Sequence, residues 1–335
     1  MAEPIKLQDR EILNRLHGLK RILEDGVAQW SGKLWRNFAI PALSIGVFLL
    51  LWAQLSSNIV TSLGTLPGPV QVYEEMQGLW ADHLAQGEQK AAFEARQAER
   101  HAKLLAADPM AKLVAREYTG KPTYVDQIFT SLQTVFMGFF LATIVAVPLG
   151  ILCGVSSTAN AALNPMIQIF RPVSPLAWLP IVTMLVSALY VSSDPMFEKS
   201  FLTSAITVTL CSLWPTLINT SVGVASIDKD LLNVGKVLRL KWHTQLLRLV
   251  LPSALPYIFT GMRLSLGVGW MVLIAAEMLA QNPGLGKFVW DEFQNGSSHS
   301  LGRIMVAVFT IGIIGFLLDR VMGMLQAFVS FSDKR

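Results

Sequence analysis

The chain has 335 residues, of which 52% are hydrophobic and only 15% are charged, well below the roughly 25% charged residues of an average soluble domain. This composition argues against a water-soluble globule. The formal net charge of +4 is modest, and the basic residues are spread along the chain instead of forming a nucleic-acid patch, so no nucleic-acid partner is expected. Both cysteines, Cys153 and Cys211, lie in apolar runs, which argues against a disulfide framework.

Long apolar runs predict about six transmembrane helices and therefore an all-α, polytopic membrane fold. A helix needs about 20 mostly apolar residues to cross the hydrocarbon core, because lipid offers unpaired backbone groups no partner. Such runs cover residues 38–55, 131–155, 164–191, 201–227, 254–280 and 302–318. The first run follows a charged stretch that is too long for a signal peptide, so we expect it to remain as the first transmembrane helix.

The third run, residues 164–191, is the least regular of the six. It contains four prolines, at Pro165, Pro172, Pro175 and Pro180, which predict kinks or breaks at several points. Broken helices are tolerated in membranes where protein or water satisfies the freed carbonyls. This segment therefore either lines a translocation path or is a kinked packing helix, and its boundaries stay open.

The distribution of Lys and Arg predicts the orientation. Residues 1–37 and the loop 228–252 are rich in Lys and Arg, which favours the cytoplasm. Six crossings also place the C-terminal segment, residues 327–335, in the cytoplasm. Residues 56–127 are expected in the periplasm, because long loops cross regardless of charge. Their composition predicts an inserted helical hairpin interrupted at Pro109, placed before a transmembrane core of residues 128–326.

Signatures of enzymes and of bound cofactors are missing from the sequence. The nearest match to a phosphate-binding loop, Gly284-Leu285-Gly286-Lys287, lacks the first glycine. The histidines have no metal-ligand spacing, and no Gly-x-Ser-x-Gly motif occurs. We therefore expect no catalytic residue, no metal site and no cofactor. Few ionisable residues lie inside the spans, which disfavours an ion-coupled secondary carrier.

The loop at residues 228–252 carries the most informative motif. It reads Asp228-Lys229-Asp230-Leu231-Leu232-Asn233-Val234-Gly235-Lys236-Val237-Leu238-Arg239-Leu240 and leads into Val250-Leu251-Pro252-Ser253-Ala254-Leu255-Pro256. This resembles the cytoplasmic signature of permease subunits of binding-protein-dependent ABC importers, an acidic-Ala-Ala triplet and a glycine on a short helix before a Leu-Pro-x-x-x-Pro turn. Here Asn233-Val234-Gly235 takes the place of the triplet, and Arg239 takes the place of the glycine.

The resemblance covers most of residues 131–326 and is strongest to the nitrate, sulfonate and bicarbonate branch, and within it to nitrate permeases. Three segments carry it: Ser193-Asp194-Pro195-Met196-Phe197, Leu213-Trp214-Pro215-Thr216-Leu217-Ile218-Asn219-Thr220 and Ala275-Ala276-Glu277-Met278-Leu279. It implies a multi-pass protein of the bacterial inner membrane that imports a small anion, with nitrate expected first and taurine, another sulfonate or bicarbonate as alternatives. A secondary carrier and a membrane scaffold without transport are the rival classes.

The same resemblance implies the partners. These are a second copy of the permease, two cytoplasmic ATPase subunits that bind the ATP, a periplasmic solute-binding protein and the surrounding lipid. Coupling to the ATPase is expected from Asp230, Leu231, Leu232, Asn233, Val234, Gly235, Lys236, Val237 and Leu238.

Leu231, Val234, Val237 and Leu238 recur at helical spacing and predict one apolar face that could enter a groove on a partner. Asp228 or Asp230 could cap the start of such a helix. The alternative is an amphipathic helix on the inner leaflet, with Lys236, Arg239 and Lys241 toward anionic lipid.

Residues of the translocation path are predicted from side chains with hydrogen-bonding groups on uncharged spans. A weakly hydrated anion could be received by such groups without being trapped. The candidates are Thr207, Thr209, Ser212, Trp214, Thr216 and Asn219, with Glu277 at the end of the fifth span. Packing or backbone hydrogen bonding explains each of these side chains equally well, so both interpretations stay open.

Overall fold

The computed structural model describes residues 35–61, 64–108, 116, 118–191, 196–297 and 299–330. The chain divides into two compact units, Met1–Gln71 and Val72–Arg335. Within the described residues, strand is limited to a two-residue antiparallel pair, β1 (Val60–Thr61) and β2 (Gly64–Thr65). The predicted all-α fold is therefore confirmed.

Among its described residues, the first unit contains one apolar helix. A π-helical turn at Trp35–Ala39 continues into α2 (Ile40–Ser56), and the unit closes with the first residues of α3. Ser56 is the buried residue of α2, and its Oγ donates to the Ala53 carbonyl at 2.9 Å. A helix that is apolar on all sides suits a membrane, and its 17 residues rise about 26 Å, slightly less than the hydrocarbon thickness of about 30 Å.

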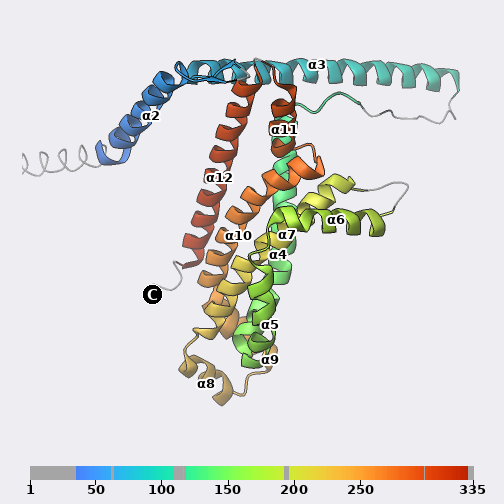
Figure 1. Ribbon diagram of the computed structural model, residues 1–335. Coiled ribbons are helices and arrows are strands. Elements are labelled where there is room, and N and C mark those ends of the chain that lie inside the picture. The colour runs from blue at the N-terminus through green and yellow to red at the C-terminus, as the bar shows by residue number, and fades with distance from the viewer. Residues whose placement is uncertain are drawn as a thin grey trace, which may run out of the picture. The chain divides into compact units, whose positions relative to one another are not determined.

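The second unit holds four helical segments that are long and apolar enough to cross a membrane. They are α4 (Tyr124–Val155), α7 (Lys199–Ala225), the continuous segment Trp242–Ala280, and α12 (Ser300–Ser330). The continuous segment consists of α9 (Trp242–Gln245), a π-helical turn at Leu246–Val250 and α10 (Leu251–Ala280). Two short helices, α8 (Lys229–Val237) and α11 (Leu285–Asn295), lie at opposite ends of this bundle (Figure 1).

The third region is broken, as its prolines predict, and the bent pair can count as one broken span. The region forms two helices, α5 (Ser157–Phe170) and α6 (Pro175–Leu189), bent by 102° with respect to each other. The break lies between Pro172 and Pro175, where Ser174 is extended as expected before a proline. Its Oγ accepts the Leu176 N–H at 3.3 Å and caps α6. Pro165 and Pro180 stay inside their helices, so the additional breaks predicted there are not found.

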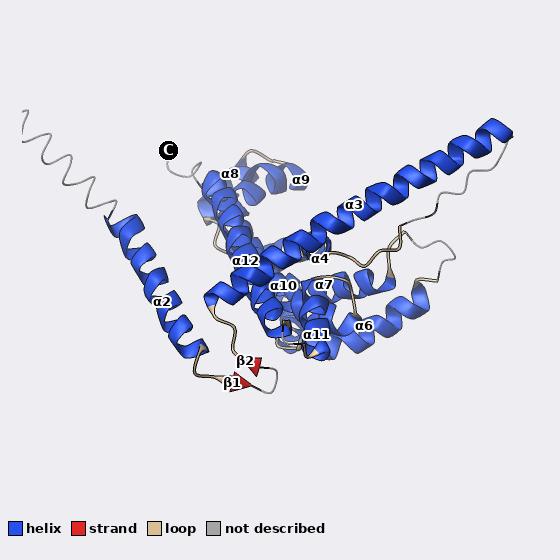
Figure 2. Cartoon of the chain, turned by 90° about the horizontal axis from the view of Figure 1, so that it is seen from above, coloured by secondary structure: helices blue, strands red, loops and turns tan. Residues whose placement is uncertain are grey.

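The first arm of the helical hairpin predicted in residues 56–127 is present as one helix of 39 residues, α3 (Pro69–Ala107). The second arm falls largely on residues 109–115 and 117, which lie outside the described part, and residues 116 and 118–123 are not helical. The returning segment follows α3 through a Tyr118–Phe93 ring contact at 5.6 Å and a His83–Thr123 hydrogen bond at 2.7 Å. From Val72 onward, α3 runs across the direction of α12 (Figures 1 and 2).

Helix α4 begins at Tyr124, seven residues before the predicted start of its span at residue 131. A capping box explains the earlier start, because the Asp126 N–H donates to Thr123 Oγ1 at 3.3 Å and the Thr123 N–H donates to Asp126 Oδ2 at 2.9 Å. Such reciprocal bonds satisfy two of the backbone donors that a helix start leaves free. The local sequence therefore sets this boundary within the segment that we expected to be a loop.

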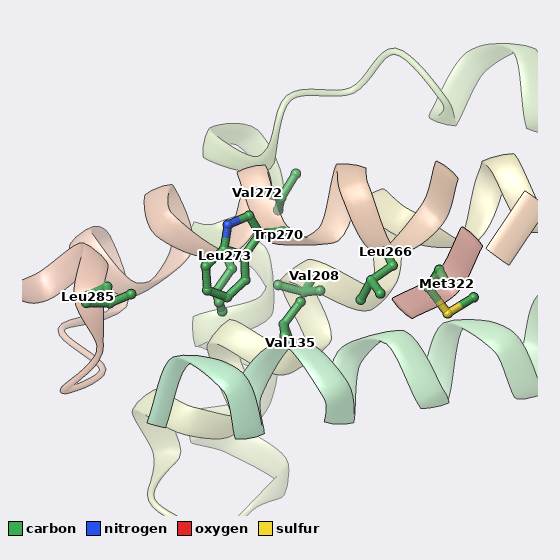
Figure 3. Close-up of a cluster of buried hydrophobic side chains, with 8 residues drawn as sticks. All are labelled: Val135, Val208, Leu266, Trp270, Val272, Leu273, Leu285 and Met322. Carbon is green, nitrogen blue, oxygen red and sulfur yellow. The ribbon is translucent and has the colours of Figure 1, made fainter. Parts of the chain in front are cut away.

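The core is organised around α7, which packs against α4 on one side and α10 on the other. Val135 of α4, Val208 of α7 and Leu273 of α10 are fully buried together (Figure 3). Small residues allow the helices to approach closely, since a Cβ on Gly150 would lie 2.7 Å from the Leu217 carbonyl oxygen, and one on Gly261 would lie 2.8 Å from Thr216 Cα. Helix α12 joins this core through Trp270, whose Nε1–H donates to the Ile311 carbonyl at 3.0 Å.

Candidate functional site

The predicted coupling residues, Asp230 to Leu238, lie on α8 and its C-cap, and both ends of the helix have defined caps. Asp228 Oδ1 accepts the Asp230 N–H at 2.9 Å, so Asp228 is the N-cap of the two acidic residues considered. At the other end, the Leu240 N–H donates to the Gly235 carbonyl and the Arg239 N–H to the Lys236 carbonyl, each at 3.0 Å. These two bonds form a Schellman motif.

Arg239 occupies the left-handed position of that motif, with φ of 49°. This conformation brings Cβ close to backbone atoms in every residue except glycine. The motif that this loop resembles has glycine in this place, and the geometry gives a physical reason for it. The departure in sequence therefore leaves the turn intact while placing strain on it.

Helix α8 turns one face toward the spans and leaves the other open. On the inner face, Leu232 packs against the cluster of Val224, Val250 and Ile258, and a Cβ on Gly235 would lie 2.9 Å from Leu249 Cδ1. The four residues predicted to form one apolar face are exposed, from 36% for Leu231 to 81% for Val237; the others are Val234 and Leu238. Helix α8 therefore packs against the spans through one face and exposes an apolar face on the other side.

A cavity of about 350 Å³ separates part of α8 from the ends of α4 and α7. Gly154 and Val224 line it on the side of the spans, and Leu232, Lys236 and Trp242 line it on the side of α8 and α9. Because this space is not filled by protein, α8 is held to the spans at few points. Small displacements of α8 relative to the spans are compatible with that arrangement.

The predicted path residues of α7 lie mostly inside the bundle. Thr207, Ser212 and Thr216 are fully buried. Thr207 Oγ1 donates to the Thr203 carbonyl at 2.8 Å, and Thr216 Oγ1 and Ser265 Oγ of α10 lie 2.7 Å apart. Backbone bonding and packing therefore account for Thr207 and Thr216 within one chain.

The remaining α7 candidates differ in their hydrogen bonding. Thr209 Oγ1 lies 2.8 Å from the Ala205 carbonyl and 3.1 Å from the Gly138 carbonyl of α4, and Asn219 Nδ2 donates to the Pro215 carbonyl at 2.8 Å. By contrast, Ser212 Oγ and Trp214 Nε1 are buried polar atoms without a hydrogen-bond partner among the described residues. The translocation path through these residues stays a prediction.

Glu277, the last path candidate, is the centre of a buried polar cluster. Its side chain is fully buried near the end of α10. Its carboxylate accepts from Ser131 Oγ of α4 at 2.8 and 2.9 Å and from the Gly286 N–H at 3.0 Å. Because Gly286 lies in the first turn of α11, the carboxylate satisfies a backbone donor that the helix start leaves free and lies where the helix dipole favours negative charge.

Two glycines allow this close approach. A Cβ on Gly284 would lie 2.1 Å from Glu277 Oε1, and one on Gly286 would lie 2.1 Å from the Ile274 carbonyl oxygen. Both glycines were noted in the sequence only as part of an incomplete phosphate-binding motif. Their role in the structure is to let the α10–α11 turn fold back onto a carboxylate.

A groove of about 650 Å³ opens next to this cluster and was not predicted. Gln133 and Phe136 of α4, Phe201 of α7 and Asn282 of the turn are among its lining residues. The Asn282 side chain donates to Thr134 Oγ1 at 3.1 Å, while its Oδ1 has no partner among the described residues. Aromatic rings and amide groups therefore meet at the same end of the bundle as α11.

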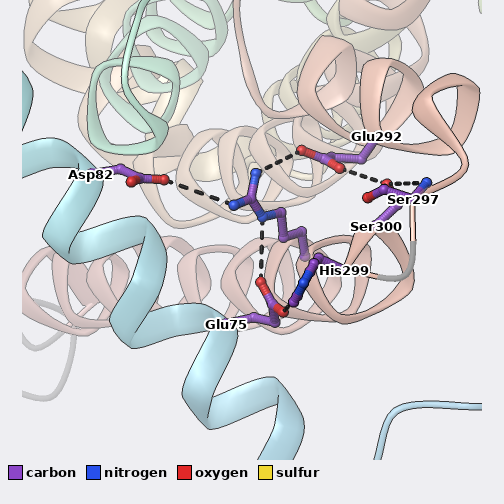
Figure 4. A network of polar contacts seen from close by, with 7 residues as sticks. Glu75, Asp82, Glu292, Ser297, His299 and Ser300 are labelled. Carbon is purple, nitrogen blue, oxygen red and sulfur yellow. Dashed lines mark hydrogen bonds and ion pairs between the residues drawn. The ribbon is translucent and has the colours of Figure 1, made fainter.

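A second polar network surrounds Arg303 at that end (Figure 4). Its guanidinium donates to Glu75 of α3 at 3.3 Å and to Glu292 of α11 at 3.4 Å, and it lies 3.8 Å from Asp82 of α3. His299 contacts the other oxygen of Glu75, and Ser300 Oγ donates to Glu292 at 2.9 Å. One arginine of α12 thus joins α3 and α11.

Three charged residues of α10 and α12 also have partners. Arg263 of α10 makes two bonds to Asp319 of α12, from Nε at 2.6 Å and from Nη2 at 2.7 Å. The Arg320 guanidinium lies 4.9 Å from the centre of the Phe316 ring. Such pairing lowers the cost of carrying ionisable groups within a membrane helix.

Comparison with known proteins defines the class. Residues 146–331 match the family described as binding-protein-dependent transport system inner membrane component. Solved structures of the methionine ABC transporter MetNI in inward-facing conformations share the fold, with a TM-score of 0.52 at 15% identity over 62% of this chain and 95% of that chain. The chain belongs to this family of ABC importer permeases. It is a multi-pass protein of the inner membrane and not an enzyme, and the resemblance inferred from the sequence is confirmed.

Particular relatives are permeases for two anions. The bicarbonate transport system permease CmpB of Synechococcus elongatus is 33% identical over 305 residues, which is 91% of this chain and 93% of that protein. The nitrate import permease NrtB of Synechocystis is 32% identical over 295 residues, 88% of this chain and 90% of that protein. NrtB of Leptolyngbya laminosa is 38% identical over 201 residues, 60% of this chain and 67% of that protein.

Proposed function

We propose that this permease imports a small planar oxyanion, with nitrate as the first candidate and bicarbonate as the second. The observation that carries the proposal is the pair of similarities just described, since permeases for both anions match most of the chain at nearly equal identity. Nitrate and bicarbonate each carry a single negative charge on a planar group of three oxygens. A path with neutral hydrogen-bond donors would suit either ion.

The distribution of charge supports such a path. Arg263 is paired with Asp319, and Glu277 is occupied by Ser131 and Gly286. The donors proposed to meet the anion are then hydroxyl, indole and amide groups, and Ser212 Oγ and Trp214 Nε1 are the two candidates of α7 that have no partner among the described residues. A second copy of the chain would complete the path.

The proposed mechanism is alternating access driven by separate ATPase subunits. The open apolar face of α8 docks into the ATPase subunit, and the closing of two ATPase subunits on ATP moves α8 and stabilises the outward-open state. The end of the bundle with α8 then faces the cytoplasm, and the end with α11 faces the periplasm. A soluble binding subunit delivers the anion to that outer end.

Transport in proteoliposomes tests the substrate. The permease is reconstituted with its ATPase subunits and solute-binding subunit, and uptake of ¹⁵N-nitrate, ¹⁴C-bicarbonate and taurine is compared with and without ATP. ATP-dependent uptake of nitrate is the expected result, and uptake of bicarbonate alone would select the second candidate. Uptake of taurine alone would contradict the proposal, and uptake driven by an ion gradient without ATP would support a secondary carrier.

The coupling role of α8 is tested with a matched pair of substitutions. Val234→Asp places a charge on the open face of α8, at a cost of several kcal/mol if a partner buries it unpaired. Val70→Asp makes the same change at an exposed position at the start of α3, where a cost within about 0.5 kcal/mol is expected. The first variant should lose the ATPase subunit on purification, and the second should keep it. Retained ATPase binding and transport in Val234→Asp would favour the lipid-surface helix.

A further inference from the structure

Helix α3 carries a stripe of large apolar side chains that nothing in the second unit covers. The stripe consists of Tyr73, Met76, Trp80 and Leu84, which follow one another at helical spacing and are each 47% to 57% exposed. Tyr, Trp and Met are enriched in the centres of protein interfaces, and Trp and Tyr are frequent binding hot spots. A row of four such residues on an extramembrane helix is therefore a candidate docking surface.

The stripe lies beside the contact between α3 and the bundle, not within it. Val72 and Leu79 are buried, and Glu75 reaches Arg303 of α12. Tyr73, Met76 and Trp80 each follow one of these three positions by one residue, which rotates the stripe by about 100° around the helix. An interfacial helix would turn its apolar side toward the membrane, on the same side as the ends of the spans. Here the stripe is rotated by about 100° away from the side of α3 that contacts the bundle.

The charges along the same stretch disfavour two of the three conceivable partners. Between Pro69 and Gln89 the chain carries four carboxylates, Glu74, Glu75, Asp82 and Glu88, and no Lys or Arg. Arg303 faces Glu75 and Asp82 and offsets one of these charges, so the stretch keeps a net negative charge. An anionic lipid surface would be repelled by it, and two copies of α3 side by side would bring like charges together. A protein with basic residues around an apolar patch is complementary to it.

The anchoring of α3 makes the stripe mechanically relevant. Arg303 connects Glu75 and Asp82 of α3 to Glu292 of α11 (Figure 4). Helix α11 begins at the cluster in which Glu277 and Ser131 join α10 to α4. A short series of polar contacts therefore connects the helix that carries the stripe to the outer ends of the spans.

We infer that the stripe of Tyr73, Met76, Trp80 and Leu84 is the docking surface for a soluble protein that presents basic residues around an apolar patch. Resting on the proposed function, the inference identifies that protein as the solute-binding subunit. Docking would then bury Trp80 at the centre of the interface, while Glu74 and Glu88 at the edges attract the basic rim.

Binding to the assembled complex tests this inference. The permease with its ATPase subunits is placed in lipid nanodiscs, and the Kd of the fluorescently labelled solute-binding subunit is measured with nitrate or bicarbonate bound. Trp80→Ala should weaken binding at least about tenfold, as expected for a central aromatic residue. Leu84→Ala should weaken it several-fold, whereas Leu104→Ala, the same change at a 51% exposed position of α3 outside the stripe, should leave Kd within about twofold.

Two further measurements separate the alternatives. Glu88→Lys should slow association and reduce its salt dependence, because steering by the acidic stretch is lost. A bimane dye on Met76→Cys should be quenched on adding the soluble subunit and not by brominated lipid. Unchanged Kd in both Trp80→Ala and Leu84→Ala would overturn the inference while leaving the importer role intact, and quenching by brominated lipid would assign the stripe to the membrane. If the unaltered complex binds no solute-binding subunit, the proposed function fails with it.

Discussion

Ser131 donates its one hydroxyl proton to both carboxylate oxygens of Glu277, at 2.8 and 2.9 Å, although the two residues are 146 positions apart. Ser131 Oγ also accepts the Leu285 N–H at 2.8 Å. One hydroxyl group therefore joins α4, α10 and the start of α11. In a buried site, each of these groups depends on the others for a partner.

This dependence predicts a large coupling between the two side chains. Ser131→Ala should lower the free energy of unfolding by about 1 to 3 kcal/mol, because it leaves a buried acceptor and a buried backbone donor less satisfied. Glu277→Gln should cost less than Glu277→Ala, since the amide keeps an acceptor for Gly286. A double-mutant cycle by SDS titration should give a coupling of about 0.5 to 3 kcal/mol. Additive effects of the two substitutions would contradict the shared site.

The close approach at the α10–α11 turn predicts opposite effects for two glycine substitutions. Gly284→Ala places a Cβ 2.1 Å from Glu277 Oε1 and should destabilise the protein by about 1 to 3 kcal/mol. Gly78→Ala on α3, where no atom lies within 4 Å, should be neutral or stabilise the helix by up to about 1 kcal/mol. Thermal unfolding in detergent compares the two variants. Equal melting temperatures would argue against the packing described for the turn.

The left-handed Arg239 predicts a stabilising substitution. Arg239→Gly removes the steric cost of φ near 49° and should stabilise the end of α8 by about 1 kcal/mol. Hydrogen exchange of the amides of Leu238 to Leu240 should slow in the variant. Arg239→Ala, which loses the charge but keeps Cβ, is the control and should show no such slowing. Faster exchange in the glycine variant would show that the arginine side chain itself holds the turn.

The network at Arg303 predicts that α3 can be released without unfolding the spans. Arg303→Met leaves Glu292, which is 7% exposed, without its cation and removes the bonds to Glu75 and Asp82. Exchange of amides in residues 72–83 should then accelerate at least about tenfold. Lys103→Met breaks an exposed pair with Glu99, which is worth within about 0.5 kcal/mol, and should leave those amides unchanged. Equal exchange in both variants would show that α3 is held by Val72 and Leu79 alone.

The apolar spans were predictable because the lipid environment restricts both the conformation and the composition of a segment that crosses it. A segment that crosses must be helical and apolar throughout, so residues 201–227 and 254–280 could be assigned within a few residues of α7 and α10. The break in the third region was not predictable to the residue, because four prolines offered similar reasons for it. The structure has the break between Pro172 and Pro175, where Ser174 caps α6.

Two missed boundaries had local signals. The Thr123 to Asp126 spacing is that of a capping box, and Leu285, Phe288 and Glu292, all buried in α11, recur at helical spacing. The Ser131 to Glu277 contact had no such signal, since it depends on how α4 and α10 pack. The position of Arg239 was visible as a departure from the related motif, but its left-handed backbone could be recognised only in the structure.

The length of α3 has a consequence for how densely such proteins can populate a membrane. Its 39 residues rise about 58 Å, roughly twice the thickness of the hydrocarbon core. Because α3 runs across the direction of α12 (Figure 1), the proposed location outside the membrane would extend this length along the bilayer surface instead of through it. A neighbouring protein with a bulky head on the same side would meet α3 before it met the spans. Lateral spacing between transporters would then be set by an extramembrane helix, and clusters of them would favour arrangements in which these helices lie alongside one another in a common direction.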